Sequence, residues 1–304
     1  MRRAVINLSY TNTSLLVAED DDGKLISLYK GYVPFDVERY SSDLKVLSDK
    51  GSLKLADDIS ALVSKASGMG ASDICVISTT LLRKTANSDD VRRILEKRTG
   101  IVIRQITGFE EARALWSVNE RYSCLERPLL VNIGVSSTEI CDYSRPNMEG
   151  MLSLPFGTAE IRENFISGNI PTKSEVKGIR SYVSSFLEGM DDDGFENAVL
   201  TGRNMNAVYS LYRDFFAVQD GDEFLMQRSR LNSLYLALMD RRSSDALIDR
   251  NCPEKRPFII PAIIVLRTIV THFRISNMTV SPLGIKEGWM KMMVGVSADG
   301  RPLT

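Results

Sequence analysis

The spacing of apolar residues changes period in a fixed order along the first third of the chain. Three apolar runs separated by short polar turns predict an antiparallel meander of strands: RRAVINLSY, TSLLVAED and KLISLYKGYV. Helical spacing then places Ile59, Leu62, Val63 and Ala66 on one face of LADDISALVSKAS. A strand, a helix, a strand and a helix follow in DICVIST, SDDVRRILEKRTG, IVIRQIT and FEEARALWSVNERY. In the first of these helices, Ser88 is the predicted N-cap and Gly100 the predicted end.

The same order begins again near residue 127. Three more strands and a helix are predicted in RPLLVNIG, STEICDYS, GMLSLPFG and SEVKGIRSYVSSFLEG. The remaining elements are NAVLTG, NMNAVYSLYRDFF, RLNSLYLALMD, IPAIIVLRTIVTHF, NMTVSP and a last helix, IKEGWMKMM. Two tandem β-β-β-α-β-α patterns predict an α/β protein with two halves, each a mixed sheet with helices on both faces. A ligand is expected in the cleft between the halves.

Composition narrows the class of protein. At 304 residues the chain is long enough for two domains, and a formal net charge of -1 gives no basic field to attract nucleic acid. Four dispersed cysteines and a single histidine argue against a zinc site and fit reduced thiols in the cytoplasm, where we expect the protein to be. The longest apolar run, FIIPAIIVL, is too short to span a bilayer, so no membrane association is expected.

The stretch VNIGVSSTEICDY, residues 131–143, has the outline of a phosphate-binding hairpin. In such a hairpin an apolar strand ends in a small-residue turn whose bare N–H groups bind an anion, usually beside an acid. Here the residue at the acid's position is Asn132, and Val135 and Ser136 interrupt the glycines. The hairpin therefore predicts either an altered phosphate site or one that no longer functions.

Several stretches together resemble the exopolyphosphatase/guanosine pentaphosphate phosphatase (Ppx/GppA) family. They are AVINLSYTNTSLLV, ISTTLLRKTANSDDVRRILEKRTGIVIRQITGFEEARALW, LLVNIGVSSTEI, SLPFGTAEI and IPAIIVLRTIVTHFRISNMTVSPLGIKEG. The resemblance implies the actin-like ATPase fold with two ribonuclease-H-like domains, residues 1–115 plus 286–304 and residues 116–285. It also implies magnesium-assisted hydrolysis of a terminal phosphoanhydride in polyphosphate or a guanosine polyphosphate, and a homodimer.

The same resemblance assigns roles to individual residues. Glu111 falls at the family's general base, Glu139 at the glutamate after the second phosphate loop, and Arg83 at a phosphate-contacting arginine. The remaining phosphate-binding positions correspond to Asn7, Ser9, Thr11, Asn132, Gly134, Ser136, Ser137 and Gly202.

The departures from the family pattern lie in the loops. Asn7 and Asn132 replace the acids of the two phosphate loops, and neutral amides attract Mg²⁺ far less than carboxylates do. We therefore expect magnesium to bind weakly or not at all, and we assign no metal ligand. Val135 would be strained at positive φ, so the loop backbone is expected to follow another path. Arg203 stands at a glycine position and Glu160 at a basic one.

Plain structural roles remain open for the same residues. Glu111 follows Glu110 at a helix start, where acids interact favourably with the helix dipole. Arg83 would then be an ordinary surface residue, and alternation with Ile140 predicts a solvated Glu139. The polar residues of SYTNTS are typical of a turn.

Three functions are consistent with the sequence. The first is a family member with a degenerate site, weak or no phosphoanhydride hydrolysis, and a phosphate-ligand-binding or regulatory role. The alternative is an active exopolyphosphatase or guanosine pentaphosphate phosphatase that uses Glu111 as its base. A sugar or acetate kinase on the same fold is disfavoured, because Arg203 and Asn204 would crowd the turn beside the adenosine.

Overall fold

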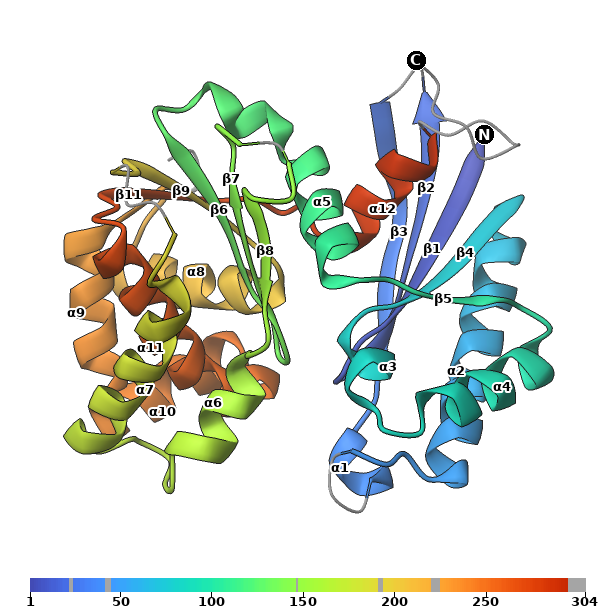
Figure 1. Cartoon of the computed structure of the whole chain (residues 1–304), viewed down its shortest axis with the longest axis horizontal. Coiled ribbons are helices and arrows are strands. Elements are labelled where there is room, and N and C mark those ends of the chain that lie inside the picture. Colours follow the sequence, from blue (N-terminus) through green and yellow to red (C-terminus); the bar gives the residue numbers. More distant parts are fainter. Residues whose placement is uncertain (22–23, 42–44, 146, 191–193, 220–224, 295–304) are drawn as a thin grey trace. The chain divides into compact units, whose positions relative to one another are not determined.

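The computed structural model describes the chain except residues 22–23, 42–44, 146, 191–193, 220–224 and 295–304. The chain forms two compact units (Figure 1). Unit 1 contains residues 1–118 and the chain from residue 285 onward, and unit 2 contains residues 119–284. No helix in the described part of the chain is long and apolar enough to cross a membrane.

Unit 1 is built on a five-stranded mixed sheet with the order β3-β2-β1-β4-β5. Its first three strands form the predicted antiparallel meander, and β4 and β5 join in parallel. The strands are β1 (Arg2–Leu8), β2 (Asn12–Asp21), β3 (Lys24–Pro34), β4 (Asp73–Ser78) and β5 (Ile103–Gln105).

Helices cover both faces of this sheet. Along β1, Ala4, Ile6 and Leu8 pack into one apolar cluster, while Val5 belongs to another, as strand alternation requires. The first cluster takes in α2 (Asp49–Gly68) and α4 (Ser88–Thr99), and the second takes in α5 (Gly108–Val118) and α12 (Ile285–Val294). The C-terminal helix thus completes the core of unit 1 although it is distant in sequence.

The shorter helices of unit 1 include α1 (Val37–Tyr40) and α3 (Thr80–Lys84). The predicted cap of α4 is wrong by one residue, because Ser88 is its first helical residue and Asn87 is the N-cap. The Asn87 side chain instead bonds both backbone groups of Leu47, at 3.0 and 2.9 Å. Gly100 ends α4 in the left-handed conformation, at φ 70°, as predicted.

Unit 2 contains a six-stranded mixed sheet with the order β10-β11-β9-β6-β7-β8. β6, β7 and β8 form the second predicted meander, and β9 and β11 run parallel to β6. The strands are β6 (Pro128–Ile133), β7 (Thr138–Asp142), β8 (Met151–Leu154), β9 (Asn197–Thr201), β10 (Leu225–Gln227) and β11 (Asn277–Val280).

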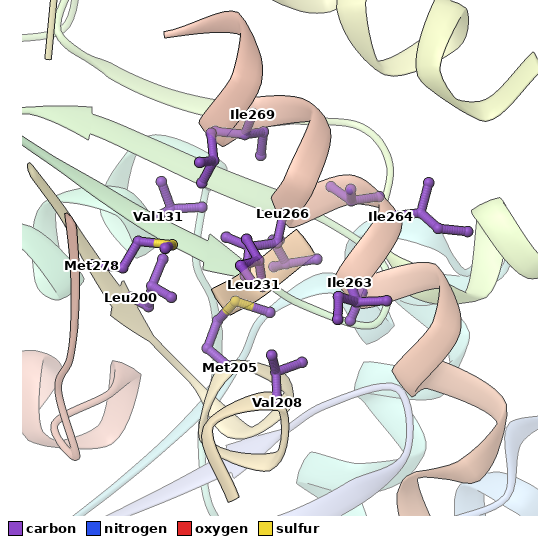
Figure 2. Packing of buried hydrophobic residues seen from close by; sticks show 14 of the residues in the cluster. Val131, Leu200, Met205, Val208, Leu231, Ile263, Ile264, Leu266, Ile269 and Met278 are labelled. Carbon is purple, nitrogen blue, oxygen red and sulfur yellow. The ribbon is translucent and has the colours of Figure 1, made fainter. Parts of the chain in front are cut away.

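One large apolar cluster joins the sheet of unit 2 to its helices. Ile263, Leu266 and Ile269 of helix α11 belong to this cluster together with the strand residues Val131 and Leu200 (Figure 2). The helical elements of this unit are η1 (Glu120–Cys124), α6 (Thr158–Phe165), α7 (Lys173–Leu187), α8 (Arg203–Phe216), α9 (Arg228–Leu238), α10 (Arg241–Asn251), η2 (Pro253–Lys255) and α11 (Arg256–His272).

Candidate phosphate-ligand site

The first predicted loop, residues 9–11, closes on itself. The backbone N–H and the hydroxyl of Ser9 both donate to the Asn12 carbonyl at 2.9 Å. Thr11 Oγ1 accepts from Asn12 Nδ2 at 3.2 Å. The Ser9 hydroxyl therefore donates its proton within the turn, in agreement with the prediction that SYTNTS forms an ordinary turn.

Asn7, which precedes this loop on β1, is 6% exposed, and its Oδ1 has no hydrogen-bond partner among the residues that the structure describes. It lies directly opposite Ser14 of β2 in the strand register. Lys286, from the start of α12, donates to Ser14 Oγ at 3.3 Å. An ammonium group thus lies beside the strand pair that carries Asn7. Only its place in the IKEG stretch could have indicated Lys286 from sequence.

Arg83 and Glu111 form the second polar group of unit 1. Arg83 Nη2 lies 2.8 Å from Glu111 Oε2 and also donates to Thr80 Oγ1 at 3.2 Å. Arg83 Nη1 donates to the Ile106 carbonyl at 3.0 Å, so the guanidinium is held in place. Glu111 is 7% exposed; burial raises its pKa above the ordinary value, while Arg83 acts in the opposite direction.

Glu110, and not Glu111, is the acid that interacts with the backbone at the start of α5. Its carboxylate accepts from the Thr107 N–H at 2.8 Å and from Arg104 at 2.9 Å. Partial burial alone would raise the pKa of Glu110, but these hydrogen bonds lower it below the ordinary value. Glu111 therefore takes no part in capping and points to Arg83 instead.

In unit 2, Asn132 at the end of β6 pairs with Glu139 of β7. Asn132 Nδ2 donates to Glu139 Oε2 at 2.6 Å, and Ser153 Oγ donates to Oε1 at 3.1 Å. The prediction of a solvated Glu139 is wrong, since this side chain is 0% exposed. The alternation of exposed and buried residues does not predict the burial of Glu139, because β7 is an inner strand between β6 and β8. Polar residues on these two strands donate hydrogen bonds to its carboxylate.

The second loop, residues 134–137, folds tightly over the start of α6. Gly134 N donates to the Ser137 carbonyl at 2.8 Å, and the carbonyls of Gly134 and Val135 accept from the first turn of α6, at 3.0 and 2.8 Å. Among the described non-glycine residues positive φ is confined to Arg127, Ala217 and Arg274, so the backbone at Val135 avoids it. Ser136 Oγ is buried and finds no hydrogen-bond partner in the described part of the chain.

Two residues at positions of the family pattern, Gly157 and Glu160, lie at the start of α6, on which this loop packs. Gly157 packs against it so closely that a Cβ there would collide with the backbone of Val135 and Ser136. Glu160 accepts from the Gly157 N–H at 3.0 Å, which explains how an acid serves at a position where a basic residue is expected.

The third turn places Gly202 at φ 89°, directly before α8. A Cβ at Gly202 would collide with Asn132 Oδ1, so this turn lies against the head of the second loop. Asn204 Nδ2 donates to the Ile133 carbonyl at 3.0 Å, and Lys255 Nζ donates to Asn204 Oδ1 at 3.2 Å. No sequence motif marks Lys255, which lies more than fifty residues away.

The structure therefore places the predicted residues in three polar groups, two in unit 1 and one in unit 2, and the first of these is the loop that contains Ser9 and Thr11 with the adjoining Asn7. Unit 1 joins Arg83 to Glu111, and unit 2 joins Asn132, Glu139 and the loop around Gly134. Within the described residues, no group of three or more His, Cys, Asp and Glu side chains could hold a metal ion.

Comparison with known proteins identifies the family. The model of the Ppx/GppA phosphatase family matches residues 17–295. This chain belongs to that family. Exopolyphosphatase 1 of Mycobacterium leprae is 21% identical over all of this chain and 92% of its own length. Guanosine-5'-triphosphate,3'-diphosphate pyrophosphatase of Vibrio parahaemolyticus is 22% identical over 96% of this chain and 59% of its own length.

Solved structures of this family share the fold. An exopolyphosphatase from Cytophaga hutchinsonii superposes with a TM-score of 0.85 at 14% identity, covering 97% of this chain and 98% of its own. The Aquifex aeolicus family member has a TM-score of 0.80 at 17% identity, covering 97% of each chain. The predicted family and the actin-like α/β fold with two mixed sheets are both confirmed.

Proposed function

We propose that this Ppx/GppA family member binds a polyphosphate or a guanosine polyphosphate with weak or no hydrolysis of its phosphoanhydride bonds. One observation carries the proposal: the residues at the heads of both phosphate loops, Asn7 and Asn132, are neutral amides, and the Asn132 nitrogen is bonded to Glu139. Such a donor set does not suit Mg²⁺, which prefers several charged or strongly polar oxygens in octahedral geometry.

Ligand binding is supported by what the loops retain. Two buried polar atoms at these loops, Asn7 Oδ1 and Ser136 Oγ, lack hydrogen-bond partners within the described ranges, which is costly unless a ligand or water satisfies them. The Ser136 hydroxyl can donate to a phosphate oxygen. Lys286 adds a positive charge near Asn7 in unit 1, where it can attract an anion without a metal.

The alternative, an active phosphohydrolase, is favoured by one specific contact. Arg83 lies against Glu111, and burial raises the pKa of Glu111, as suits a general base. Glu111 would take the proton of the attacking water, and Arg83 would contact the transferred phosphate. We rank this function second, because developing phosphate charge would lack a well-held cation, and the barrier would rise by several kcal/mol.

The proposal is tested by restoring the loops. The variant Asn7→Asp, Asn132→Asp, Val135→Gly, Ser136→Gly should bind Mg²⁺ more tightly than the wild type in calorimetric titration, and its phosphate release from polyphosphate should increase. Wild-type protein should bind tripolyphosphate in the presence of EDTA. No binding by the wild type would exclude the proposed function, and unchanged metal affinity in the variant would remove its physical basis.

We also propose that units 1 and 2 are the two family domains. The predicted tail of the first domain includes residues 295–304, which lie outside the described residues. The homodimer and the cytoplasmic location stay predictions.

A further inference from the structure

The ion pair of unit 1 occupies both hydrogens of one guanidinium nitrogen. Arg83 Nη2 donates to Glu111 Oε2 at 2.8 Å and to Thr80 Oγ1 at 3.2 Å. The second nitrogen, Nη1, donates to the Ile106 carbonyl at 3.0 Å and so fixes the plane of the group. A terminal guanidinium nitrogen carries two hydrogens. An oxygen atom from a ligand therefore bonds Nη2 only by displacing one of its two acceptors.

Glu111 is the acceptor that an anionic ligand would displace. Thr80 is neutral, whereas the Glu111 carboxylate has the same sign of charge as a phosphate and repels it. The Arg83 side chain is 19% exposed and that of Glu111 9%, so the arginine is the more accessible partner. The planar guanidinium also suits phosphate oxygens, which it binds with two parallel hydrogen bonds.

A displaced Glu111 would be a buried carboxylate beside an anion. In the free protein, burial raises the pKa of Glu111, and the charge and hydrogen bond of Arg83 oppose this rise. A phosphate that takes Arg83 away removes the opposing effect and adds a negative charge. Both changes favour the protonated form of Glu111.

Arg83 is the charged group that acts on Glu111 among the described residues. On α5 itself, Glu110 accepts from Arg104, and Arg113 is exposed. The charged residues of α12, which packs with α5 in one apolar cluster, have contacts of their own: Lys286 with Ser14, Glu287 with Lys30 and Lys291 with the Ser117 carbonyl.

We propose that a ligand phosphate takes the place of Glu111 on Arg83, and that Glu111 binds a proton from solvent as it is displaced. The inference rests on the proposed function and concerns the regulation of that site. Because a general base must be deprotonated, the ligand would inactivate its own candidate base unless a cation neutralised the phosphate. Binding then need not lead to hydrolysis in a chain whose loops carry Asn7 and Asn132.

The test is calorimetric titration of tripolyphosphate in EDTA between about pH 5 and 8. Glu111→Gln keeps the shape of the side chain and removes its charge, so it should bind at least about tenfold more tightly than the wild type near pH 8. This difference should shrink as pH is lowered, because the wild-type carboxyl is then already protonated. The matched control is Glu110→Gln, which removes the same charge one residue away and should bind like the wild type.

Proton uptake gives a second readout, which a purely structural ion pair would not change. Heats of binding in buffers of different ionisation enthalpy give the number of protons bound together with the ligand. The wild type should take up more protons than Glu111→Gln, by up to one, with a maximum between about pH 5 and 8.

The outcomes separate the inference from the proposed function. If the wild type binds and Glu111→Gln binds equally or more weakly, with the same proton uptake, the inference is wrong and the proposed function stands. Binding by Glu111→Gln but not by the wild type would support the displacement and contradict the proposed function. If neither protein binds tripolyphosphate, both are wrong.

Discussion

At the scale of single residues, the contact between Asn132 and Glu139 decides what the second loop can hold. The Asn132 amide donates to the buried Glu139 carboxylate and leaves its own oxygen as a neutral acceptor. A carboxylate at position 132 would instead face Glu139 at hydrogen-bond distance in a buried place, where two like charges repel strongly.

Asn132→Asp should therefore destabilise the protein by about 1–3 kcal/mol in EDTA, because it replaces a hydrogen bond with charge repulsion. Magnesium should restore part of the loss if the two acids can share the ion. Thermal unfolding with and without Mg²⁺ measures both effects, and Asn132→Asp/Glu139→Gln is the control that removes the repulsion. Equal stability of wild type and Asn132→Asp in EDTA would contradict the contact.

Unlike the Asn132 amide, Arg83 neutralises the charge of the buried carboxylate that it contacts, Glu111. Arg83→Met should cost about 3–5 kcal/mol near pH 8, because Glu111 would keep a buried charge without a partner. Burial already raises the pKa of Glu111, and loss of Arg83 raises this pKa more. Between the pKa of Glu111 in the unfolded chain and its raised pKa in the folded variant, the folded state therefore binds a proton that the unfolded chain releases. The deficit should therefore shrink as pH is lowered towards about 5. Chemical denaturation across this range measures it, and a deficit that does not depend on pH would show that Glu111 is not the affected group.

At the scale of elements, much of the order was predictable from sequence. The two meanders, α2, α7 and α11 follow from the spacing of apolar residues, because each element buries one face or both. The short helices α3 and α6 were not predicted, since five and eight residues are too few to show a helical period. Longer-range packing determines them.

The positions of the site residues were predictable where family motifs mark them. Their contacts were not predictable where the partners come from segments that are distant in the sequence. Glu139 is a clear example: its neighbours in sequence predict exposure, whereas Asn132 and Ser153 on adjacent strands bury it. Lys255 reaches Asn204 from a segment without a motif, and Lys286 lies in the IKEG stretch of the family pattern, but its contact with Ser14 is tertiary.

The support of the second loop by α6 gives a prediction for this element. Gly157→Ala should destabilise unit 2 by about 2–4 kcal/mol, because its Cβ would collide with the backbone of Val135 and Ser136 and force the loop to move. Gly178→Ala is the control: the nearest atom to its Cβ would be 3.5 Å away in Phe165, and within α7 alanine should stabilise by about 0.5–1 kcal/mol. Unfolding curves of both variants test this, and a neutral Gly157→Ala would show that the loop is not held by α6.

At the scale of the whole molecule, the family fold is kept while the chemistry of its loops is altered. Solved family structures superpose on 97% of this chain, and within this chain α12 contributes to the core of unit 1. Among the altered residues, Val135 has a backbone conformation outside the positive-φ region, so its branched side chain is not strained there.

The most direct measurement is phosphate release from long-chain polyphosphate in saturating Mg²⁺, with wild type and Glu111→Gln compared at equal concentration. The account predicts that the two rates are equal and close to that of a protein-free blank, while the wild type still binds the polymer. Magnesium-dependent release by the wild type that disappears in Glu111→Gln would contradict it.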